Sequence, residues 1–373
     1  MDREPTDRSS AATSHRQWLS ESIRSTKQLL LRPADFRPSR DDFEVIGAFN
    51  PGAVEAGGEI VLLVRVAERP REVRPGFIAL PRFTADARLL IDWVRQEEVE
   101  FIDPRVVQLL ETGCVRLTFV SHLRVVRLGG TDSLRQVAEA AFVPEEPWEE
   151  FGVEDPRITT INGRFYFTYV AVSRHGAATA LASTDDFRGF SRHGIIFPPE
   201  NKDVVLFPEK LGNEYVALHR PNGRTSFTAP EMWIARSPDL VAWGGHAPVF
   251  AEKVGWESGR VGAGAPPLRT PLGWLEIYHA NRRPTEPGAV GQYVAAAIVL
   301  DAEDPSRVVA RSVEPLFSPT EPFEREGFVA DVVFPTGIVA RQNRLVVYYG
   351  ASDTYTGVAE LPLEETLASL QQI

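Results

Sequence analysis

The sequence predicts an all-β protein of the β-propeller class, because one phrase recurs along most of the chain. The phrase is a proline after a short apolar or acidic pair, then a small loop with glycine or asparagine, then an apolar strand. Its copies follow one another at intervals of about 50 to 70 residues, as expected for propeller blades. Their prolines are Pro51, Pro104, Pro156, Pro208, Pro267 and Pro335.

Each copy also has the composition of β-strands. Its apolar residues are β-branched or aromatic and run for a few positions between Gly, Asn and Pro. Several copies continue into a further strand, at 177–187, 231–240 and 291–301. Three or four short strands per repeat favour a propeller, and a jelly roll in which Pro and Gly recur by chance is the alternative. In a propeller the first strand of every blade lines the central channel, so the proline segments are expected to converge on one site.

The two ends of the chain depart from the repeat. Residues 1–14 are expected to form a disordered tail, and 15–31 carry a helix-like apolar stripe. The chain therefore divides into an N-terminal tail and helical extension at 1–40 and a propeller at 41–373, which ends in a short helix within 363–373. The N-terminal helix is expected to pack on the propeller or on a second subunit, and the second case would make a homo-oligomer.

Composition limits the class of partner. The chain has 373 residues, of which 43% are hydrophobic and 24% charged, which is ordinary for a globular protein. Its net charge of −11 provides no positive field for nucleic acid or for an anionic membrane. We therefore expect a small or neutral partner.

Cysteine usage and the N-terminus indicate the compartment. Cys114 is the single cysteine, which fits a reducing environment. The N-terminal residues have no apolar signal segment, and the longest apolar run, 293–300, is too short to cross a membrane. We expect a cytoplasmic protein. No His and Cys cluster has metal-ligand spacing and no nucleotide-binding loop is found, so no metal or organic cofactor is expected.

Several motifs stand in order between residues 45 and 355. They are GVEDPRIT (152–159), KDVVLFPEK (202–210) with LHRP (218–221), GAGAPP (262–267) with GWLEIYH (273–279), and VVFPTG (332–337) with YYGASD (348–353). Together they resemble glycoside hydrolase family 130, the mannoside phosphorylases and mannosidases. The resemblance implies action on β-mannosides from the nonreducing end, with inversion.

The resemblance also implies five blades, whereas the sequence has six proline units. Two explanations are open. The first and last units share one blade, or one unit is not a full blade, and 102–119 has the least regular surroundings.

Cleavage of a glycosidic bond needs an acid on one face of the sugar and a nucleophile on the other. By resemblance, Asp155 in the EDPR motif is the general acid, with the proton passing through a sugar hydroxyl. The neighbouring Glu154 and a position at the rim are expected to raise the pKa of Asp155 toward neutral pH. A turn cap before Pro156 is the plain structural alternative.

The sugar itself is expected to bind polar groups at matching family positions. By resemblance, Asn50, Arg65 and Asp353 hydrogen-bond the mannose at the nonreducing end, although Arg65 could also end a strand at the surface and Asp353 could form a turn. Further candidate substrate-binding residues near the motifs are Glu154, Arg157, Asp203 and His279. A packed structural histidine is at least as plausible for His279.

The side chains that face the general acid decide whether the sequence indicates a phosphorylase or a hydrolase. Basic and hydroxyl side chains at the family's phosphate positions would hold inorganic phosphate as a co-substrate: Lys202, His219, Arg220, Arg260 and Tyr293. Two glutamates, Glu200 in PPEN and Glu257 in WES, match instead the mannosidase branch, in which one acts as base toward water. Their negative charge would also repel phosphate.

We give the two glutamates more weight, so the sequence favours an inverting hydrolase that removes mannose from β-1,2-linked mannooligosaccharides. Asp155 is then the acid and Glu257 or Glu200 the base. A mannoside phosphorylase that makes mannose 1-phosphate is the second hypothesis. A sugar-binding propeller without catalysis is the third, although a mere binder has no need of Asp155.

Overall fold

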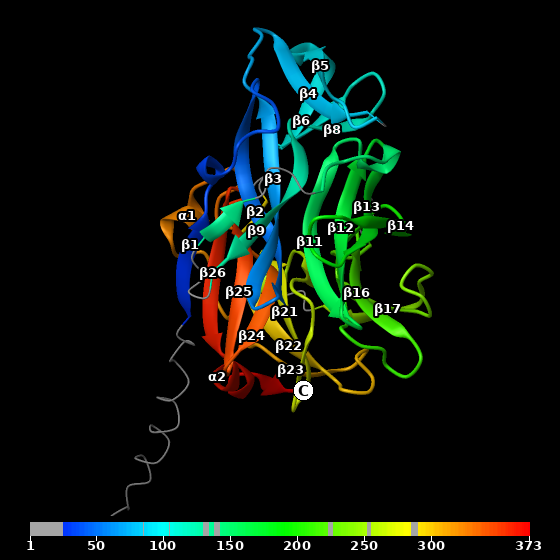
Figure 1. Ribbon diagram of the computed structural model, residues 1–373, viewed down its shortest axis with the longest axis vertical. Helices are drawn as coiled ribbons and strands as arrows, with labels where there is room; N and C mark the ends of the chain where they lie inside the picture. Colours follow the sequence, from blue (N-terminus) through cyan, green and yellow to red (C-terminus); the bar gives the residue numbers. More distant parts are fainter. Residues whose placement is uncertain are drawn as a thin grey trace, which may run out of the picture.

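The protein is an all-β molecule, as the sequence predicts, and its helices are short (Figure 1). The computed structural model describes residues 25–84, 86–103, 105–129, 134–137, 142–222, 227–251, 255–284 and 290–373. The α-helices within these ranges are α1 (Pro322–Arg325) and α2 (Leu363–Ala368). The 3₁₀ turns are η1 (Pro33–Asp35), η2 (Gln96–Glu98), η3 (Pro147–Glu149) and η4 (Gly255–Glu257).

Most strands form antiparallel units that follow one another along the chain, and the first two units are joined into one sheet by a parallel pairing at Gly152 and Ser121. The first unit contains β2 (Phe43–Ala56), β3 (Glu59–Pro70), β9 (Val120–Leu128) and β10 (Leu134–Val137). The second contains β11 (Gly152–Ile161), β12 (Arg164–Ser173), β13 (Gly176–Thr184) and β14 (Ser191–Phe197). The third contains β15 (Asn201–Leu206), β16 (Tyr215–Pro221), β17 (Met232–Ser237) and β18 (Gly244–Phe250).

Two further units complete the set. The fourth contains β19 (Val261–Ala263), β20 (Leu268–Thr270), β21 (Gly273–Asn281), β22 (Tyr293–Leu300), β23 (Val308–Arg311) and β27 (Gln371–Gln372). The fifth contains β24 (Val333–Arg341), β25 (Arg344–Ala351), β26 (Tyr355–Pro362) and β1 (Thr26–Leu31). All eight residues of β22, YVAAAIVL, are buried. Such a continuous apolar run is typical of a strand covered on both faces.

The hydrophobic core lies between the units and joins them in a ring. One buried cluster lies between the first and second units, and others lie between the second and third, the third and fourth, and the fourth and fifth. A fifth cluster joins the last unit to the first, where Leu31, Tyr348 and Val358 pack against Ile60 and Val126. Each unit therefore buries both of its faces against neighbours.

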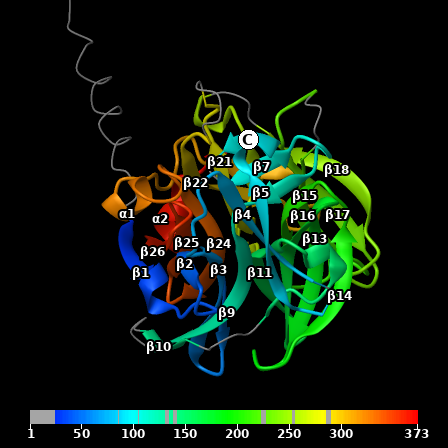
Figure 2. The ribbon, with the colours of Figure 1, turned by 90° about the horizontal axis from the view of Figure 1, so that it is seen from above.

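A small insertion between β3 and β9 stands apart from the five units. Its strands are β4 (Phe77–Phe83), β5 (Leu89–Arg95), β6 (Val99–Asp103), β7 (Val106–Leu109) and β8 (Val115–Leu117). Figure 1 shows it above the units, and Figure 2, from above, shows β4, β5 and β7 in front of them. Residues 102–119 therefore belong to this insertion and to the segment just before β9, and they do not form a four-stranded unit of their own.

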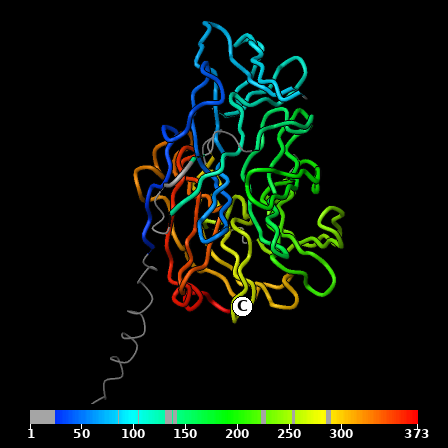
Figure 3. The backbone as a smooth tube through the Cα atoms, viewed as in Figure 1, coloured from blue at the N-terminus to red at the C-terminus, as the bar shows by residue number. Residues whose placement is uncertain are grey.

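The expected N-terminal helix is wrong for residues 26–31. They form strand β1, which pairs antiparallel with β26, so that the blue and red ends of the tube in Figure 3 run side by side. The open edge of β26 offers backbone groups that need partners, and this demand from a distant part of the chain outweighs the local apolar stripe. Residues 1–24 of the predicted tail and helix lie outside the described residues, so the homo-oligomer stays a prediction.

The C-terminal helix is confirmed but shorter than expected. Helix α2 ends at Ala368, and β27 then pairs with β23 of the fourth unit. Helix α2 lies at the end of the molecule opposite the insertion (Figure 1).

Candidate active site

A cavity of about 210 Å³ opens where the units meet beneath the insertion. All five units and the insertion contribute to its wall. The lining residues are Asn50, Arg65, Arg105, Val106, Leu117, Phe119, Glu154, Asp155, Lys202, Asp203, Arg220, Asn222, Arg260, Val290, Tyr293, Val329, Val332, Phe334 and Asp353. The expected convergence of segments far apart in the sequence is therefore present.

Four acidic or amide residues at the cavity share an unusual backbone conformation. Asn50, Asp155, Asp203 and Asp353 all have a positive φ, between 48° and 56°. Asn and Asp adopt this left-handed region more readily than most residues. The first three lie at register shifts in β2, β11 and β15, where a bulge breaks the regular alternation. Bulges of this kind redirect a side chain, here into the cavity.

One side of the cavity, which we call the acid wall, consists of Asn50, Arg65, Arg105, Glu154, Asp155 and Asp353. The amide of Asn50 donates a hydrogen bond to Oδ1 of Asp155 at 2.8 Å, and Nη1 of Arg65 donates to the same oxygen at 3.0 Å. Arg65 also binds Glu154 at 2.6 Å. Its guanidinium lies over the Phe49 ring, 4.7 Å from the centroid. The carboxylates of the EDPR motif are thus fixed by a cation from another unit.

This pairing changes the expected ionisation of Asp155. Burial alone would raise the pKa of Asp155, but the charges of Arg65 and Arg157 and the hydrogen bond from Asn50 together lower it below its usual value. The expectation of a raised pKa for Asp155 is therefore wrong. Glu154 does not act as a lone like charge, because Arg65 neutralises it.

Arg105 completes the acid wall and was missed in the sequence. Its Nη1 donates to Oδ2 of Asp353 at 2.9 Å, and its Nη2 to Oδ2 of Asp103 at 3.0 Å. Asp353 is therefore held by a side chain of the insertion. The segment 103–105 repeats the Asp-Pro-Arg of the EDPR motif, which is the one signal that could have pointed to it.

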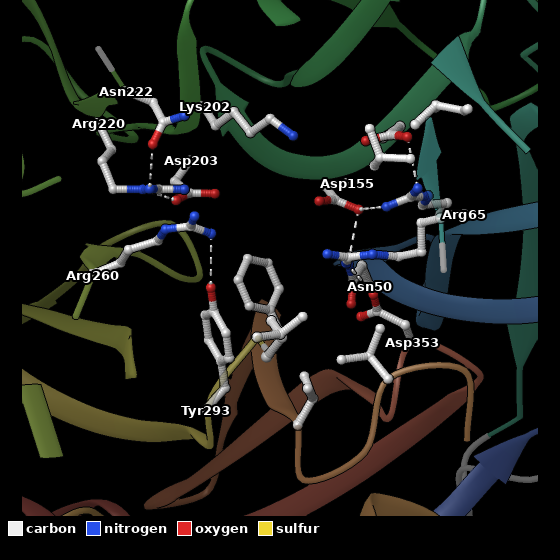
Figure 4. A pocket seen from close by; sticks show the side chains of 18 of the residues that line it. Asn50, Arg65, Asp155, Lys202, Asp203, Arg220, Asn222, Arg260, Tyr293 and Asp353 are labelled. Carbon is white, nitrogen blue, oxygen red and sulfur yellow. Dashed lines mark hydrogen bonds and ion pairs between the residues drawn. The ribbon is translucent and has the colours of Figure 1, made fainter. Parts of the chain in front are cut away.

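The opposite side, which we call the cation wall, consists of Lys202, Arg220, Asn222, Arg260 and Tyr293 (Figure 4). Nη1 of Arg260 donates to the hydroxyl oxygen of Tyr293 at 3.3 Å. Arg220 binds Asp203 through Nε at 2.5 Å. Among the residues that the structure describes, Lys202 and Arg260 have no carboxylate partner. This wall therefore carries two positive charges that are not held in an ion pair within the described residues.

Three predicted substrate-binding residues form a buried cluster beside the cation wall. Asp203 binds Arg157, Arg220 and His279, and only Arg220 shares the cavity lining with it. Burial would raise the pKa of Asp203, but Arg220, His279 and Arg157 hold it well below its usual range. Burial in turn lowers the pKa of His279, against the opposing effect of Asp203. Arg157 and His279 thus lie behind the cavity wall.

The remaining three predicted residues do not line the cavity. Oε2 of Glu257 is 2.7 Å from Nη2 of Arg311, and its Oε1 accepts a hydrogen bond from the Tyr278 hydroxyl at 2.5 Å. Oε1 of Glu200 accepts from the backbone N–H of Ala177 at 3.2 Å. His219 lies between Asn201 and His246, at 3.0 and 3.1 Å.

The described part of the chain shows neither a metal-binding group nor a membrane-spanning helix. It contains no group of three or more His, Cys, Asp or Glu side chains that could hold a metal ion. None of its helices combines the length and the apolar character needed to span a bilayer.

Comparison with known proteins gives consistent matches over the whole fold. The model of glycoside hydrolase family 130, described as beta-1,4-mannooligosaccharide phosphorylase, matches residues 120–372. The chain is 38% identical over 349 residues to a beta-1,2-mannobiose phosphorylase of Listeria innocua, which covers 92% of this chain and 96% of that protein. It is 39% identical over 218 residues to a 1,2-beta-oligomannan phosphorylase of Thermoanaerobacter, covering 57% of this chain and 69% of the relative.

A solved structure agrees with these matches. The beta-1,2-mannobiose phosphorylase of Listeria innocua, in complex with beta-1,2-mannobiose, superposes on this protein with a TM-score of 0.87 at 36% identity. The superposition covers 93% of this chain and 99% of that one. The similarity therefore includes the insertion and all five units.

Proposed function

Because the chain belongs to glycoside hydrolase family 130, we propose that it is an inverting phosphorylase of β-1,2-linked mannosides. Inorganic phosphate attacks the anomeric carbon of the mannose at the nonreducing end. The bond from that carbon to the oxygen of the next sugar breaks, and this oxygen receives a proton. The products are α-mannose 1-phosphate and a mannoside shortened by one unit.

The observation that carries this proposal is the unneutralised charge of Lys202 and Arg260 on the cation wall. A half-buried cation without a carboxylate partner, such as Lys202, is costly unless an anion fills the site, and the exposed Arg260 adds a second positive charge beside it. Arg220 and the hydroxyl of Tyr293 add further donors. Phosphate is the anion that the proposed reaction supplies, and Arg and Lys are its usual ligands. The names of the relatives support both phosphate as co-substrate and the β-1,2 linkage.

Asp155 is the proposed proton donor, acting across the cavity from the cation wall. Burial would raise the pKa of Asp155, but Arg65, Arg157 and Asn50 lower it, so this side chain is a carboxylate near neutral pH. We propose that phosphate, by offsetting the positive charge of Lys202, raises the pKa of Asp155 when both substrates are bound. Asn50, Arg65 and Asp353 hold the mannose, while Arg105 keeps Asp353 in place.

The hydrolase hypothesis has less support than it had from the sequence. A base for water has to reach the anomeric carbon, whereas Glu200 and Glu257 are outside the cavity lining. We propose instead that Glu257 anchors its turn through Arg311 and Tyr278 and that Glu200 anchors its loop on Ala177. Their charge then has no effect on phosphate entry.

We also propose that residues 41–373 form a five-bladed β-propeller, with the five units as blades. The support is the ring of core clusters, including the one between the last unit and the first. In this arrangement β1, from the region 1–40, completes the last blade. The proline unit at 102–119 belongs to the insertion, which explains five blades from six prolines.

The test is to incubate the protein with β-1,2-mannobiose, with and without inorganic phosphate. A phosphorylase releases mannose 1-phosphate only when phosphate is present. Free mannose formed at the same rate without phosphate would support the hydrolase. Neither product from any β-mannoside would favour a sugar-binding protein without catalysis.

A further inference from the structure

We propose that Asp203 is a positioning residue that joins the proton donor to the phosphate-binding cations, and that it does not itself bind substrate. This inference depends on the proposed phosphorylase function. It concerns how the acid wall and the cation wall are held at a fixed separation, although they come from different units of the fold.

Asp203 has three protein partners, which occupy both of its carboxylate oxygens. Its Oδ1 accepts a hydrogen bond from Nη2 of Arg157 at 3.0 Å. Its Oδ2 contacts Nε of Arg220 at 2.5 Å and Nε2 of His279 at 3.0 Å. The side chain is 2% exposed. A carboxylate with three buried donors is well placed to orient them and poorly placed to bind a sugar hydroxyl as well.

Arg157 carries the connection to the acid. Its Nη1 donates to the main-chain oxygen of Asp155 at 3.1 Å, and its Nε donates to that of Gly264 at 3.2 Å. Asp155 lies at a bulge with a φ of 50°, so its main chain is not held by a regular strand ladder. Arg157 therefore fixes the backbone from which the acid projects, and Asp203 fixes Arg157.

Arg220 carries the connection to the phosphate side. Its Nε is bound to Asp203, while its Nη1 lies 3.5 Å from Oδ1 of Asn222 on the cation wall. Engagement of Nε sets the plane of the guanidinium and leaves its terminal nitrogens toward the cavity (Figure 4). The same carboxylate thus orients one arginine behind the acid and one arginine facing the anion.

Gly262 is independent evidence that the side chains around Asp203 are closely packed. A Cβ at this position would lie 2.5 Å from Oδ2 of Asp203, 2.7 Å from Nε2 of His279 and 2.9 Å from Nε of Arg220. Gly262 does not have a positive φ, so its lack of a side chain serves close packing alone. A methyl group here would push the carboxylate away from both of its Oδ2 partners.

The test uses Asp203→Asn, because Asn keeps the shape and tolerates the positive φ. We expect the KM for phosphate to rise by about 30-fold or more and kcat to fall, since one partner of a buried charge pair is removed. The Kd of β-1,2-mannobiose without phosphate is expected to change by less than about twofold, because Asn50, Arg65 and Asp353 are intact. A purely structural role would lower Tm and the active fraction but would leave both constants unchanged, and that result would overturn the proposal.

A second variant covers the case in which Asp203→Asn does not fold. Gly262→Ala keeps every charge and is expected to raise the KM for phosphate in the same direction. Gly244→Ala is the matched control, because a Cβ there meets nothing within 4 Å. Wild-type protein that releases mannose without phosphate would refute the phosphorylase itself. A phosphate-dependent wild type with an unchanged phosphate KM in both variants would refute only the role of Asp203.

Discussion

Both walls of the cavity contain arginines and an asparagine, but they balance their charges differently. On the acid wall each arginine lies against two carboxylates, Arg65 with Glu154 and Asp155, and Arg105 with Asp353 and Asp103. On the cation wall only Arg220 has such a partner among the described residues. Figure 4 shows the two groups facing each other across the cavity.

The difference indicates what each wall binds. Arginines that are already paired present a rigid, nearly neutral set of donors and acceptors, which suits the hydroxyl groups of a sugar. Unpaired cations attract an anion and stabilise charge that moves toward them during the reaction. One wall is therefore suited to a neutral mannosyl unit and the other to phosphate.

Removal of the general acid on the acid wall is expected to cause the largest loss of activity. In Asp155→Asn the left-handed backbone is kept, but no proton can be donated. General acid catalysis contributes about 10²- to 10⁴-fold, so we expect kcat to fall by that factor while β-1,2-mannobiose still binds. Steady-state kinetics and calorimetry measure the two effects separately.

Asp331→Asn is the matched control for that variant. Asp331 also has a positive φ, of 59°, but its side chain is half exposed and lies 3.8 Å from Arg325 outside the cavity lining. Its activity should equal that of the wild type. Turnover by Asp155→Asn at the wild-type rate would remove Asp155 from its role.

The sequence predicted which residues form the acid wall better than it predicted their ionisation. The proline-opened strands predicted that their openings converge, and the family resemblance assigned Asn50 and Asp155 to one site. The pKa of Asp155 could not be predicted, because it depends on Arg65, which is 90 residues away in the sequence. The sequence shows only Glu154 beside Asp155, which suggested the opposite direction.

Long-range pairing also limited the fold prediction. The residues of β1 look helical in isolation and become a strand because β26 has a free edge. The insertion was missed because 102–119 reads like another blade opening, and Arg105 was missed with it. For Glu200 and Glu257 the sequence shows a carboxylate near the right motif, but only tertiary packing decides whether it points into the cavity.

Loss of one free cation tests the cation wall. In Lys202→Met we expect the KM for phosphate to rise by about 10- to 100-fold, because a hydrogen bond to a charged group contributes about 1.5–3 kcal/mol. The Kd of mannobiose without phosphate should stay near that of the wild type. Initial rates at varied phosphate and fixed mannobiose measure the first effect.

Lys210→Met is the matched control, since the Lys210 ammonium donates to backbone oxygens of Asn213 and Pro238, lies over the Tyr215 ring and does not line the cavity. It removes the same charge from the same unit of the fold. An equal rise of the phosphate KM in both variants would mean that net charge, and not the cation wall, attracts phosphate.

The pH dependence of the reaction rate tests whether phosphate bound at the cation wall changes the pKa of Asp155 on the acid wall. A required acid with a lowered pKa is protonated only below that pKa, so the rate is lost as pH rises through it. The pKa of Asp155 is lowered by Arg65, Arg157 and Lys202 against the effect of burial, and bound phosphate offsets Lys202. The pH profile of kcat/KM reports the pKa of Asp155 without substrates, and that of kcat reports its pKa in the substrate complex. We therefore expect kcat to decline at a higher pH than kcat/KM, when both rates are corrected for the concentration of phosphate dianion. Coincident limbs would contradict the coupling, and Lys202→Met should bring the limbs closer together.

The smallest effect on kcat is expected for Glu200 and Glu257, the two residues that the sequence suggested as the base for water. Glu200→Gln keeps the shape and the acceptor toward Ala177, and the residue is outside the cavity lining. We expect kcat to change by less than about twofold, as for a substitution away from the site. In Glu257→Gln the Tm should fall, because the half-buried Arg311 loses its ion pair with Glu257, while kcat per folded protein is kept. A loss of about 10²-fold or more in kcat for either variant, with normal folding, would restore that glutamate as a catalytic base and with it the hydrolase.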